Sequence, residues 1–326
     1  MRLKYLGERR VISRIRRSFG QKRADVLLGI GDDAALVRGP ERLLLTTDIL
    51  VEDEDFRLAD HPPRLLGRKA LNVNLSDIAA MGGRPLHALV GMALPGDIED
   101  GWFRQFMGGF RSAARDAGVA LVGGDLSQAG KVMIAVTVTG QVKSPIRRGG
   151  ARPGDAIFVS GTLGDAAAGL RLLEKGGING VVKPVRPLVK AFLDPVPRLT
   201  LGALLAGRRL ASAMIDLSDG LSVDLAHICA ESGVGAEIEA ARIPVSEALT
   251  RFSRDPLDMA LNGGEDFELL FTVRPARLAA VEALAPKHRL TRIGRVIPGR
   301  KIRLVAVGGR KKLLRPRGFE HFLSGL

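Results

Sequence analysis

Residues 63–83 have the sequence PRLLGRKALNVNLSDIAAMGG, and this stretch indicates more about the fold than any other part of the chain. Ala70, Val73 and Asp77 recur at intervals of three and four, together with a leucine one turn earlier. Such intervals place side chains on one face of an α-helix. The two final glycines favour an end to the helix. The pattern predicts a helix over 63–81 that carries an aspartate on its packed face.

Strand-like and helix-like segments alternate on both sides of this helix. The segment 143–155 is rich in proline, glycine and charge, which makes it the best candidate for a domain boundary. We therefore predict an α+β protein with two mixed α/β domains, 1–145 and 146–326. The expected strands are 43–47, which runs into Asp48, then 132–142, 156–160, 215–217 and 267–273; the expected helices are 11–19, 102–117, 163–174 and a helix capped by Ser218 that extends to about 231.

The charge balance argues against nucleic-acid binding as the main role. The 326 residues include 49 Lys and Arg against 35 Asp and Glu, a formal charge of +14. Residues 1–25 hold nine basic and two acidic residues, and 300–326 hold eight and one, so the chain between them is neutral. Aromatic residues make up only 4%, which leaves few side chains on which bases could stack.

Membrane insertion and disulfide formation are not expected either. No apolar run approaches the roughly 20 residues that cross a bilayer, and charged residues follow Met1 closely. Cys229 is the single cysteine, so it has no internal partner, and its apolar neighbours favour a buried structural thiol. We expect a cytoplasmic protein.

The carboxylates that indicate chemistry occur in six short strings, most of them rich in glycine, each expected at the end of an apolar segment. Glycine lets a bulky anion approach the backbone, whose free amides can bind phosphate oxygens. Aspartate supplies hard oxygen ligands that suit Mg²⁺. Because carboxylates alone would repel a phosphate, the combination predicts several Mg²⁺ ions that hold a phosphorylated ligand. The strings are Gly29-Ile30-Gly31-Asp32-Asp33, Thr46-Thr47-Asp48, Asn74-Leu75-Ser76-Asp77, Gly123-Gly124-Asp125, Asp216-Leu217-Ser218-Asp219-Gly220 and Gly263-Gly264-Glu265-Asp266.

No Walker-type phosphate loop is present, and the glycines at 29–31 are not followed by the rest of a dinucleotide fingerprint. The sequence therefore does not indicate an ordinary P-loop enzyme.

Two other classes of protein remain compatible with these strings. A non-catalytic binder of nucleotides or nucleic acid would use the basic ends and need no metal. A structural protein would carry the same aspartates merely as turn residues.

Four segments, in this order, resemble the thiamine-monophosphate kinase family of the PurM-like superfamily, to which aminoimidazole ribonucleotide synthetase also belongs. They are 29–35 (GIGDDAA), 69–82, 160–170 (SGTLGDAAAGL) and 263–269 (GGEDFEL). The resemblance covers nearly the whole chain. It implies two PurM-like domains and a homodimer, with ATP and several Mg²⁺ ions in a cleft. The N-terminal domain would serve metal and ATP binding and dimerisation. The implied activity is ATP-dependent phosphorylation of thiamine monophosphate to the diphosphate.

The resemblance also assigns roles to individual residues. The metal shell would consist of Asp33, Thr46, Thr47, Asp48, Asp77, Asp125, Asp216 and Asp219. Contacts to the nucleotide would come from Gly124, Asp125, Arg148 and Ser218. A contact to the substrate would come from Glu265.

The substrate side departs from the family pattern. Asp55 stands where the family usually has a histidine near the substrate, and Pro316 stands where an aromatic residue would stack on the thiamine ring. The family's Gly-Gly-Asp-Thr-Thr is Gly123-Gly124-Asp125-Leu126-Ser127 here. These changes keep a second hypothesis open, in which the same ATP and metal site acts on another small metabolite.

The expected reaction is direct in-line transfer of the γ-phosphoryl group of ATP to the phosphate of thiamine monophosphate. That phosphate is already an anion at neutral pH, because its second pKa is near ~6. The task is therefore to bring two polyanions together, which metal ions and backbone amides accomplish. We assign no general base and no covalent nucleophile.

Overall fold

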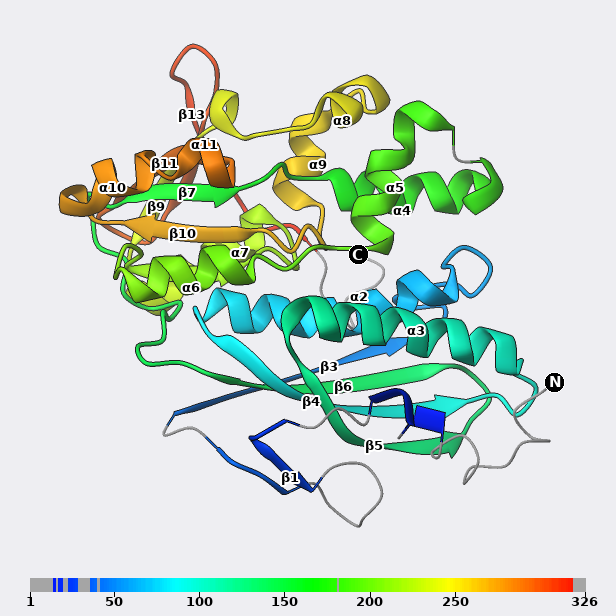
Figure 1. The fold of residues 1–326 in the computed structure, drawn as a ribbon. Coiled ribbons are helices and arrows are strands. Elements are labelled where there is room, and N and C mark those ends of the chain that lie inside the picture. The colour runs from blue at the N-terminus through cyan, green and yellow to red at the C-terminus, as the bar shows by residue number, and fades with distance from the viewer. Residues whose placement is uncertain are drawn as a thin grey trace. The chain divides into compact units, whose positions relative to one another are not determined.

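The computed structural model describes residues 14, 15, 17–19, 23–28, 36–39, 42–180 and 182–318. The chain forms two compact units, which combine helices with β-sheet (Figure 1). The first holds the chain up to Ile78 together with Gly83–Lys143, and the second holds Ala79–Gly82 and the chain from Ser144 onward. Among the described residues, no helix is both long and apolar enough to cross a membrane.

The first unit contains a sheet in the strand order β3-β6-β4-β5. Strand β6 runs antiparallel to β3 and β4, whereas β4 and β5 are parallel. Helices α2 and α3 lie on one face of this sheet (Figure 1). The bounds are β1 (Val26–Leu28), β2 (Leu36–Val37), β3 (Leu43–Val51), α2 (Pro63–Ala80), β4 (Arg84–Leu94), α3 (Asp100–Ala117), β5 (Ala120–Gln128) and β6 (Met133–Gln141).

Two glycines let α2 and α3 pack closely. A Cβ on Gly67 would lie 2.0 Å from the carbonyl oxygen of Phe106, and one on Gly109 would lie 1.8 Å from that of Arg64. Any larger residue at either position would push the helices apart, because a backbone carbonyl cannot give way. Helix α3 ends at Gly118, whose φ of 69° is the left-handed conformation that glycine adopts without strain.

The second unit contains a sheet in the order β13-β12-β9-β11-β7-β10-β8. Strand β7 pairs antiparallel with β10 and β11, and β10 pairs antiparallel with β8. The bounds are β7 (Ala156–Ser160), α4 (Asp165–Gly176), α5 (Arg186–Leu193), α6 (Leu199–Gly207), β8 (Ala213–Asp216), α7 (Leu221–Ser232), β9 (Gly235–Glu239), α8 (Glu247–Phe252), α9 (Pro256–Asn262), β10 (Leu269–Val273), α10 (Leu278–Glu282), α11 (Ala285–His288), β11 (Leu290–Ile297), β12 (Ile302–Val305) and β13 (Lys311–Leu313), with 3₁₀ turns at Ile178–Gly180, Lys183–Val185, Ala240–Arg242 and Pro275–Arg277.

This second sheet is covered on both faces. Ile157 and Val159 of β7 belong to the core that includes α7 and α9, whereas the alternate residue Phe158 packs with α6 and α10. A strand buried on both faces has a continuous apolar sequence, as in β7 and β10, where every residue is buried. The α+β architecture of two mixed units agrees with the prediction.

Several element boundaries differ from the expectation. Strand β3 continues past Asp48 to Val51, because β6 supplies a ladder partner for every residue of it. Asp77 likewise lies inside α2, and Asp125 lies inside β5. The expectation that every acidic string ends an apolar segment was therefore wrong for Asp48, Asp77 and Asp125. Helix α4 begins at Asp165 and β10 at Leu269, each two residues later than expected.

Candidate functional site

The first unit brings Thr46, Asp48 and Asp77 together. Side chains alternate along β3, so Thr46 and Asp48 share the face that α2 covers. The hydroxyl of Thr46 donates a hydrogen bond to Oδ2 of Asp77 on that helix. Asp48 is half-buried, and desolvation together with the charges of Asp77 and Asp55 raises the pKa of its carboxyl to about 7.

Thr47 points away from this group. Its hydroxyl donates to the carbonyl oxygen of Val136 at 3.1 Å and accepts from the hydroxyl of Thr137 at 3.0 Å, on the exposed side of the sheet. The alternation of a strand allows no other outcome for the residue between Thr46 and Asp48. The side chain of Thr47 is therefore not brought together with the two aspartates.

Asp125 is also remote from Asp48 within this unit. The ladder aligns Asp125 with Gly91, Ala135 and Ile49, a row on the exposed face, whereas Gly124 aligns with Asp48. Strands β3 and β5 are separated by three strand spacings, which amounts to about 14 Å. Oxygen ligands of one Mg²⁺ lie about 2.1 Å from the ion, so these two aspartates of one chain cannot share it.

Asp55 closes the turn that follows β3. Its Oδ2 accepts a hydrogen bond from the backbone N–H of Val51 at 2.8 Å, and Asp53 within the turn has a φ of 70°. One of the two oxygens of this carboxylate thus accepts a hydrogen bond within the local structure. Its charge acts on Asp48, which places Asp55 beside the acidic group of the first unit.

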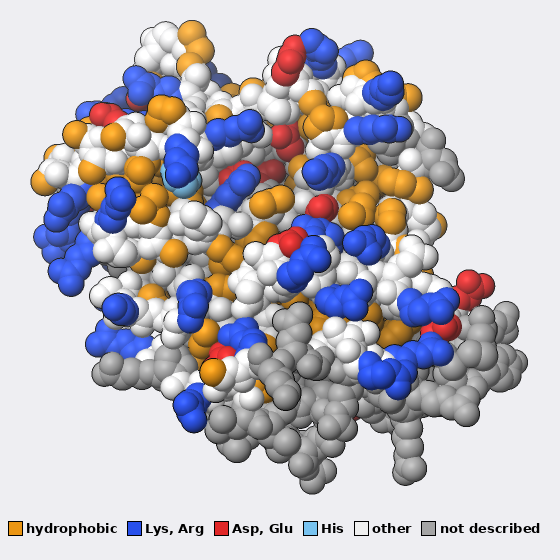
Figure 2. Space-filling view, in the orientation of Figure 1, with side chains coloured by type: hydrophobic (Ala, Val, Ile, Leu, Met, Phe, Trp, Pro, Cys, Tyr) orange, Lys and Arg blue, Asp and Glu red, His pale blue; other side chains and the backbone are white. Residues whose placement is uncertain are grey.

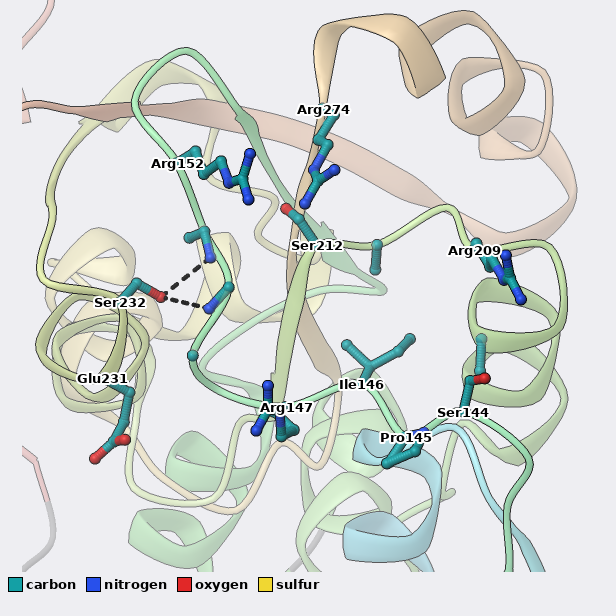
Figure 3. A pocket seen from close by; sticks show the side chains of 15 residues that line it. Ser144, Pro145, Ile146, Arg147, Arg152, Arg209, Ser212, Glu231, Ser232 and Arg274 are labelled. Atoms are coloured by element: carbon teal, nitrogen blue, oxygen red, sulfur yellow. Dashed lines mark hydrogen bonds between the residues drawn. The ribbon is translucent and has the colours of Figure 1, made fainter.

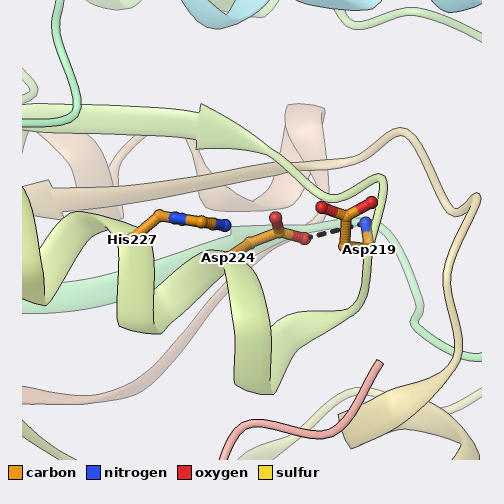
Figure 4. Close-up of side chains that lie close together, drawn as sticks. All are labelled: Asp219, Asp224 and His227. Carbon is orange, nitrogen blue, oxygen red and sulfur yellow. Dashed lines mark hydrogen bonds between the residues drawn. The ribbon is translucent and has the colours of Figure 1, made fainter. Parts of the chain in front are cut away.

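The second unit brings Asp216, Asp219 and Asp224 together at the end of β8. Figure 4 shows Asp224 and Asp219 side by side, with His227 one turn further along α7. Oδ2 of Asp224 accepts from the N–H groups of Asp219 and Gly220 at 3.2 and 3.1 Å. Burial raises the pKa of the Asp224 carboxyl to about 8, and the charges of Asp219 and Asp216 add to the effect.

Asp224 is the residue that sequence reasoning missed. One ligand atom each of Asp219, Asp224 and His227 lie within 4.8 Å of one another, a spacing suited to one cation. The available signal was its position in the first turn of α7, where a carboxylate caps a helix. The expectation that Ser218 caps this helix was wrong: the helix begins after Gly220, and Asp224 accepts from the amides there.

The loop with Glu265 lies along the same edge. The N–H of Glu265 donates to the carbonyl oxygen of Ser218 at 2.7 Å, and a Cβ on Gly264 would lie 2.5 Å from that oxygen. Glu265 itself has a φ of 67°, a conformation that stores about 1 kcal/mol of strain in a non-glycine residue. The structure thereby holds Glu265 beside Ser218 and Asp219.

Asp266, the next residue, has a structural role. Its carboxylate accepts hydrogen bonds from the N–H groups of Gly164 and Ala166, at 2.7 and 3.3 Å, and so caps α4. Burial raises the pKa of this carboxyl well above its usual value. Together with Gly164, whose φ is 84°, it joins two of the segments on which the family resemblance rests.

The C-terminal segment passes over the start of α7. Ser222 on α7 donates to the carbonyl oxygen of Arg317 at 2.8 Å and accepts from its N–H at 3.0 Å. Pro316 is exposed next to it.

The side chain of Arg148 is exposed on the loop before β7, and the backbone carbonyl oxygen of Arg148 accepts a hydrogen bond from the hydroxyl of Ser232 at 3.2 Å. Asp33 lies outside the described residues.

Both acidic groups have the chemistry of a magnesium site. Their donors are carboxylate and hydroxyl oxygens, which Mg²⁺ prefers. In each group the neighbouring carboxylates help to raise the pKa of one member, Asp48 in the first and Asp224 in the second, and a bound cation relieves that repulsion. The residues therefore fit the metal that the sequence predicted.

Comparison with known proteins identifies the family. Residues 31–142 match the AIR synthase related protein family in its N-terminal domain, and 152–307 match its C-terminal domain. The chain is 38% identical over 329 residues to the thiamine-monophosphate kinase of Aquifex aeolicus, which covers 99% of this chain and 100% of that protein. It is 41% identical over 282 residues to the Escherichia coli K12 enzyme, which covers 85% of each. The chain belongs to the thiamine-monophosphate kinase family.

Solved structures of this family have the same fold. The thiamine-monophosphate kinase of Stenotrophomonas maltophilia superimposes with a TM-score of 0.83 at 40% identity, covering 90% of this chain and 95% of that one. A structure described as AaThiL complexed with AMPPCP and TMP superimposes with a TM-score of 0.79 at 37% identity and covers 99% of both chains. The hydrogenase maturation protein HypE shares the fold at 21% identity, with a TM-score of 0.77.

Proposed function

We propose that this chain transfers the γ-phosphoryl group of ATP to the phosphate of thiamine monophosphate, and so forms thiamine diphosphate. The observation that carries the proposal is the pairing of Thr46 and Asp48 on β3 with Asp77 on α2, in a member of the thiamine-monophosphate kinase family. The solved family structure that contains an ATP analogue and TMP supports the choice of both substrates.

Mg²⁺ is the cation that we propose for both acidic groups. Thr46, Asp48 and Asp77 would hold it in the first unit, and Asp216, Asp219 and Asp224 in the second. Bound Mg²⁺ neutralises phosphate charge and orients the transferred group. Ser218 and Glu265 lie at the edge of the second group, joined by a hydrogen bond between their loops, and there they would contact nucleotide and substrate.

No residue is proposed as a general base or covalent nucleophile. The acceptor phosphate is an anion at neutral pH and needs no deprotonation. The role of the chain is to place and neutralise charge, so loss of one carboxylate should remove most of the rate while the fold survives.

A coupled assay for thiamine diphosphate tests this function. Wild-type protein should form the diphosphate with MgATP, and Asp77→Asn should be slower by about 10²-fold or more. Asp97→Asn is the matched control, because Asp97 is an exposed carboxylate and belongs to neither acidic group. Normal turnover by Asp77→Asn would contradict the assigned site.

A second candidate acceptor is another small phosphorylated metabolite. Asp55 stands at a position that resembles a substrate contact of the family, but one of its oxygens accepts a hydrogen bond within the turn after β3. Pro316 has no aromatic ring that could stack on a thiamine ring. The same assay with a panel of metabolites separates the two candidates. ADP release with another compound, and no diphosphate from thiamine monophosphate, would support this second acceptor.

We also propose that two copies associate through the exposed face of the first sheet. Leu45 and Ile49 of β3 are 68% and 57% exposed on that face, and Leu89 and Met133 beside them are exposed as well. Apolar side chains gathered in this way favour an interface. Dimerisation also offers a use for Asp125, which lies on the same face and cannot reach Asp48 of its own chain.

Sedimentation of the full chain tests the association. Wild-type protein should sediment as a dimer, and Leu45→Asp should shift it toward the monomer. Leu313→Asp is the control, because Leu313 is an exposed leucine too, at 57%, but lies on the other unit. A monomeric wild-type protein would refute the interface.

A nucleic-acid binder is less well supported. In Figure 2 the Lys and Arg side chains are scattered over the visible face, without the single stripe that tracks a phosphate backbone. A cytoplasmic location fits a reaction that consumes ATP.

A further inference from the structure

Four arginines line a pocket in the second unit, apart from the acidic group of Asp216, Asp219 and Asp224. The pocket has a volume of about 620 Å³, and its lining includes Arg147, Arg152, Arg209 and Arg274 (Figure 3). A volume of this size suits a small molecule. None of the residues named above for metal, nucleotide or substrate belongs to the lining, although Arg148 lies in the same loop between Arg147 and Gly149.

The pocket lies at the opposite end of the sheet from the acidic group. Ser212, in its lining, precedes β8, and Arg274 follows β10, whereas Asp216 ends β8. Strand β8 is four residues long and so separates the two places by about 10–13 Å. A ligand held by the acidic group would therefore not fill the arginine pocket.

The positive charge of the pocket is not neutralised by the protein. Within the described part of the chain, none of the four guanidinium groups forms an ion pair. Glu231 is the one acidic side chain in the lining, and Figure 3 shows it pointing away from Arg152 and Arg274. Arginine keeps its charge at all physiological pH values. An anion in the pocket would relieve the mutual repulsion of these groups.

Elsewhere in the same unit, basic side chains do gather on a carboxylate. Glu237 accepts from Arg295 and Lys311 at 3.0 and 2.6 Å, and Arg303 is 3.3 Å away. Among the residues that the structure describes, no carboxylate pairs with the pocket arginines in this way. The pocket also borders the C-terminal ends of α6 and α7, each of which carries about half a negative charge. These two helix ends together offset about one positive charge, which leaves the pocket basic.

The loop that forms one wall is held in a defined shape. The N–H groups of Gly150 and Ala151 both donate to the hydroxyl of Ser232 at 3.1 Å. Gly150 has a φ of 148°, and a Cβ there would lie 2.3 Å from the carbonyl oxygen of Ser212. Asp155 accepts from Ser212 at 2.6 Å and from the N–H of Arg152 at 3.0 Å. A wall fixed in this way orders the arginine backbones before a ligand arrives.

We propose that this pocket binds a small molecule that carries at least two phosphate groups. The planar guanidinium fork matches phosphate oxygens, and several forks around one hollow match several phosphates. The lining contains no aromatic side chain on which a base or other ring could stack. The phosphate groups therefore supply the binding, and single-stranded nucleic acid, which needs stacking, is a poorer fit.

Inorganic tripolyphosphate is the probe, titrated calorimetrically into the full chain in EDTA at low salt. EDTA keeps the metal-dependent site out of the measurement, so the result does not depend on kinase activity. Wild-type protein should bind, and Arg152→Gln/Arg274→Gln should bind at least about tenfold more weakly, since the loss of even one charge-assisted hydrogen bond costs a factor of about ten. Arg300→Gln/Arg310→Gln removes the same charge from exposed turns and should bind within twofold of wild type.

Three results would overturn the proposal. The first is an equal loss of tripolyphosphate affinity in both double variants, which would indicate non-specific attraction. The second is an unchanged affinity in Arg152→Gln/Arg274→Gln. The third is wild-type protein that binds a single-stranded oligonucleotide but not tripolyphosphate. If that double variant fails to fold, Arg209→Gln replaces it, because Arg209 is exposed and lines another side of the pocket. A wild-type melting temperature for each variant verifies the fold.

Discussion

Replacing Asp48 with asparagine should stabilise the metal-free protein while it abolishes activity. Asp48 is half-buried between Asp77 and Asp55, and its carboxyl has a pKa of about 7 instead of the ordinary 3.8. The ionised form is therefore penalised in the folded state. The difference corresponds to at most about 4 kcal/mol, because each pKa unit is worth 1.36 kcal/mol. Since solvent reaches part of the side chain and screens the charges, we expect about 1–2 kcal/mol.

The sign of the effect sets its pH window. Below the unfolded pKa of 3.8 the carboxyl is neutral in both states, and Asp48→Asn should change nothing. As the pH rises toward about 7, the unfolded chain releases its proton before the folded one, so wild-type stability falls. The variant carries no such charge. The free energy of unfolding of Asp48→Asn should therefore exceed that of the wild type by an amount that grows between pH 4 and 7 and levels off above pH 8.

Thermal melts in EDTA measure this advantage. A difference of 1–2 kcal/mol should raise the melting temperature by roughly 2–8 °C at pH 8. Added Mg²⁺ should raise the melting temperature of the wild type more than that of Asp48→Asn, because a ligand that binds only the folded state stabilises it. Asp97→Asn serves as the control. A variant less stable than wild type at pH 8, or an advantage that does not depend on pH, would refute the reasoning.

Three further predictions concern other parts of the chain. Gly124→Ala should lower the free energy of unfolding, measured by denaturant titration, by several kcal/mol, because the new Cβ would lie 2.0 Å from the carbonyl oxygen of Val90. Gly130→Ala is the control and should be neutral, because no atom lies within 4 Å of the Cβ position there. Glu237→Gln should lose about 2 kcal/mol at neutral pH, since it breaks up three basic contacts. Those contacts hold the pKa of Glu237 at about 2, so the loss should shrink as the pH falls from about 4.5 toward 2; an effect constant with pH would contradict this. Cys229 is buried, and burial raises the pKa of its thiol to about 11, so alkylating reagents should modify it only in denaturant; rapid labelling of the native protein would show that this account is wrong.

Local patterns in the sequence predicted the elements that carry the first acidic group, whereas the family resemblance assigned its residues to a metal shell. The three- and four-residue spacing of 63–81 was enough to place Asp77 on the packed face of α2, and the apolar run before Asp48 was enough to indicate a strand. The alternation of that strand also contained the information that Thr47 faces away from Thr46 and Asp48. These features depend on neighbours a few residues apart, so one stretch of chain determines them.

The composition of the metal groups depended on the tertiary structure. Asp224 joins Asp219 because α7 turns back over the end of β8, and Asp125 does not reach Asp48 of its own chain because β6 and β4 lie between β5 and β3. The arginine pocket likewise combines residues from 147 to 274, which no spacing in the sequence connects. Strand order and register are set by which apolar faces pack together across the whole unit. They depend on contacts between segments far apart in the sequence, so a local pattern cannot predict them.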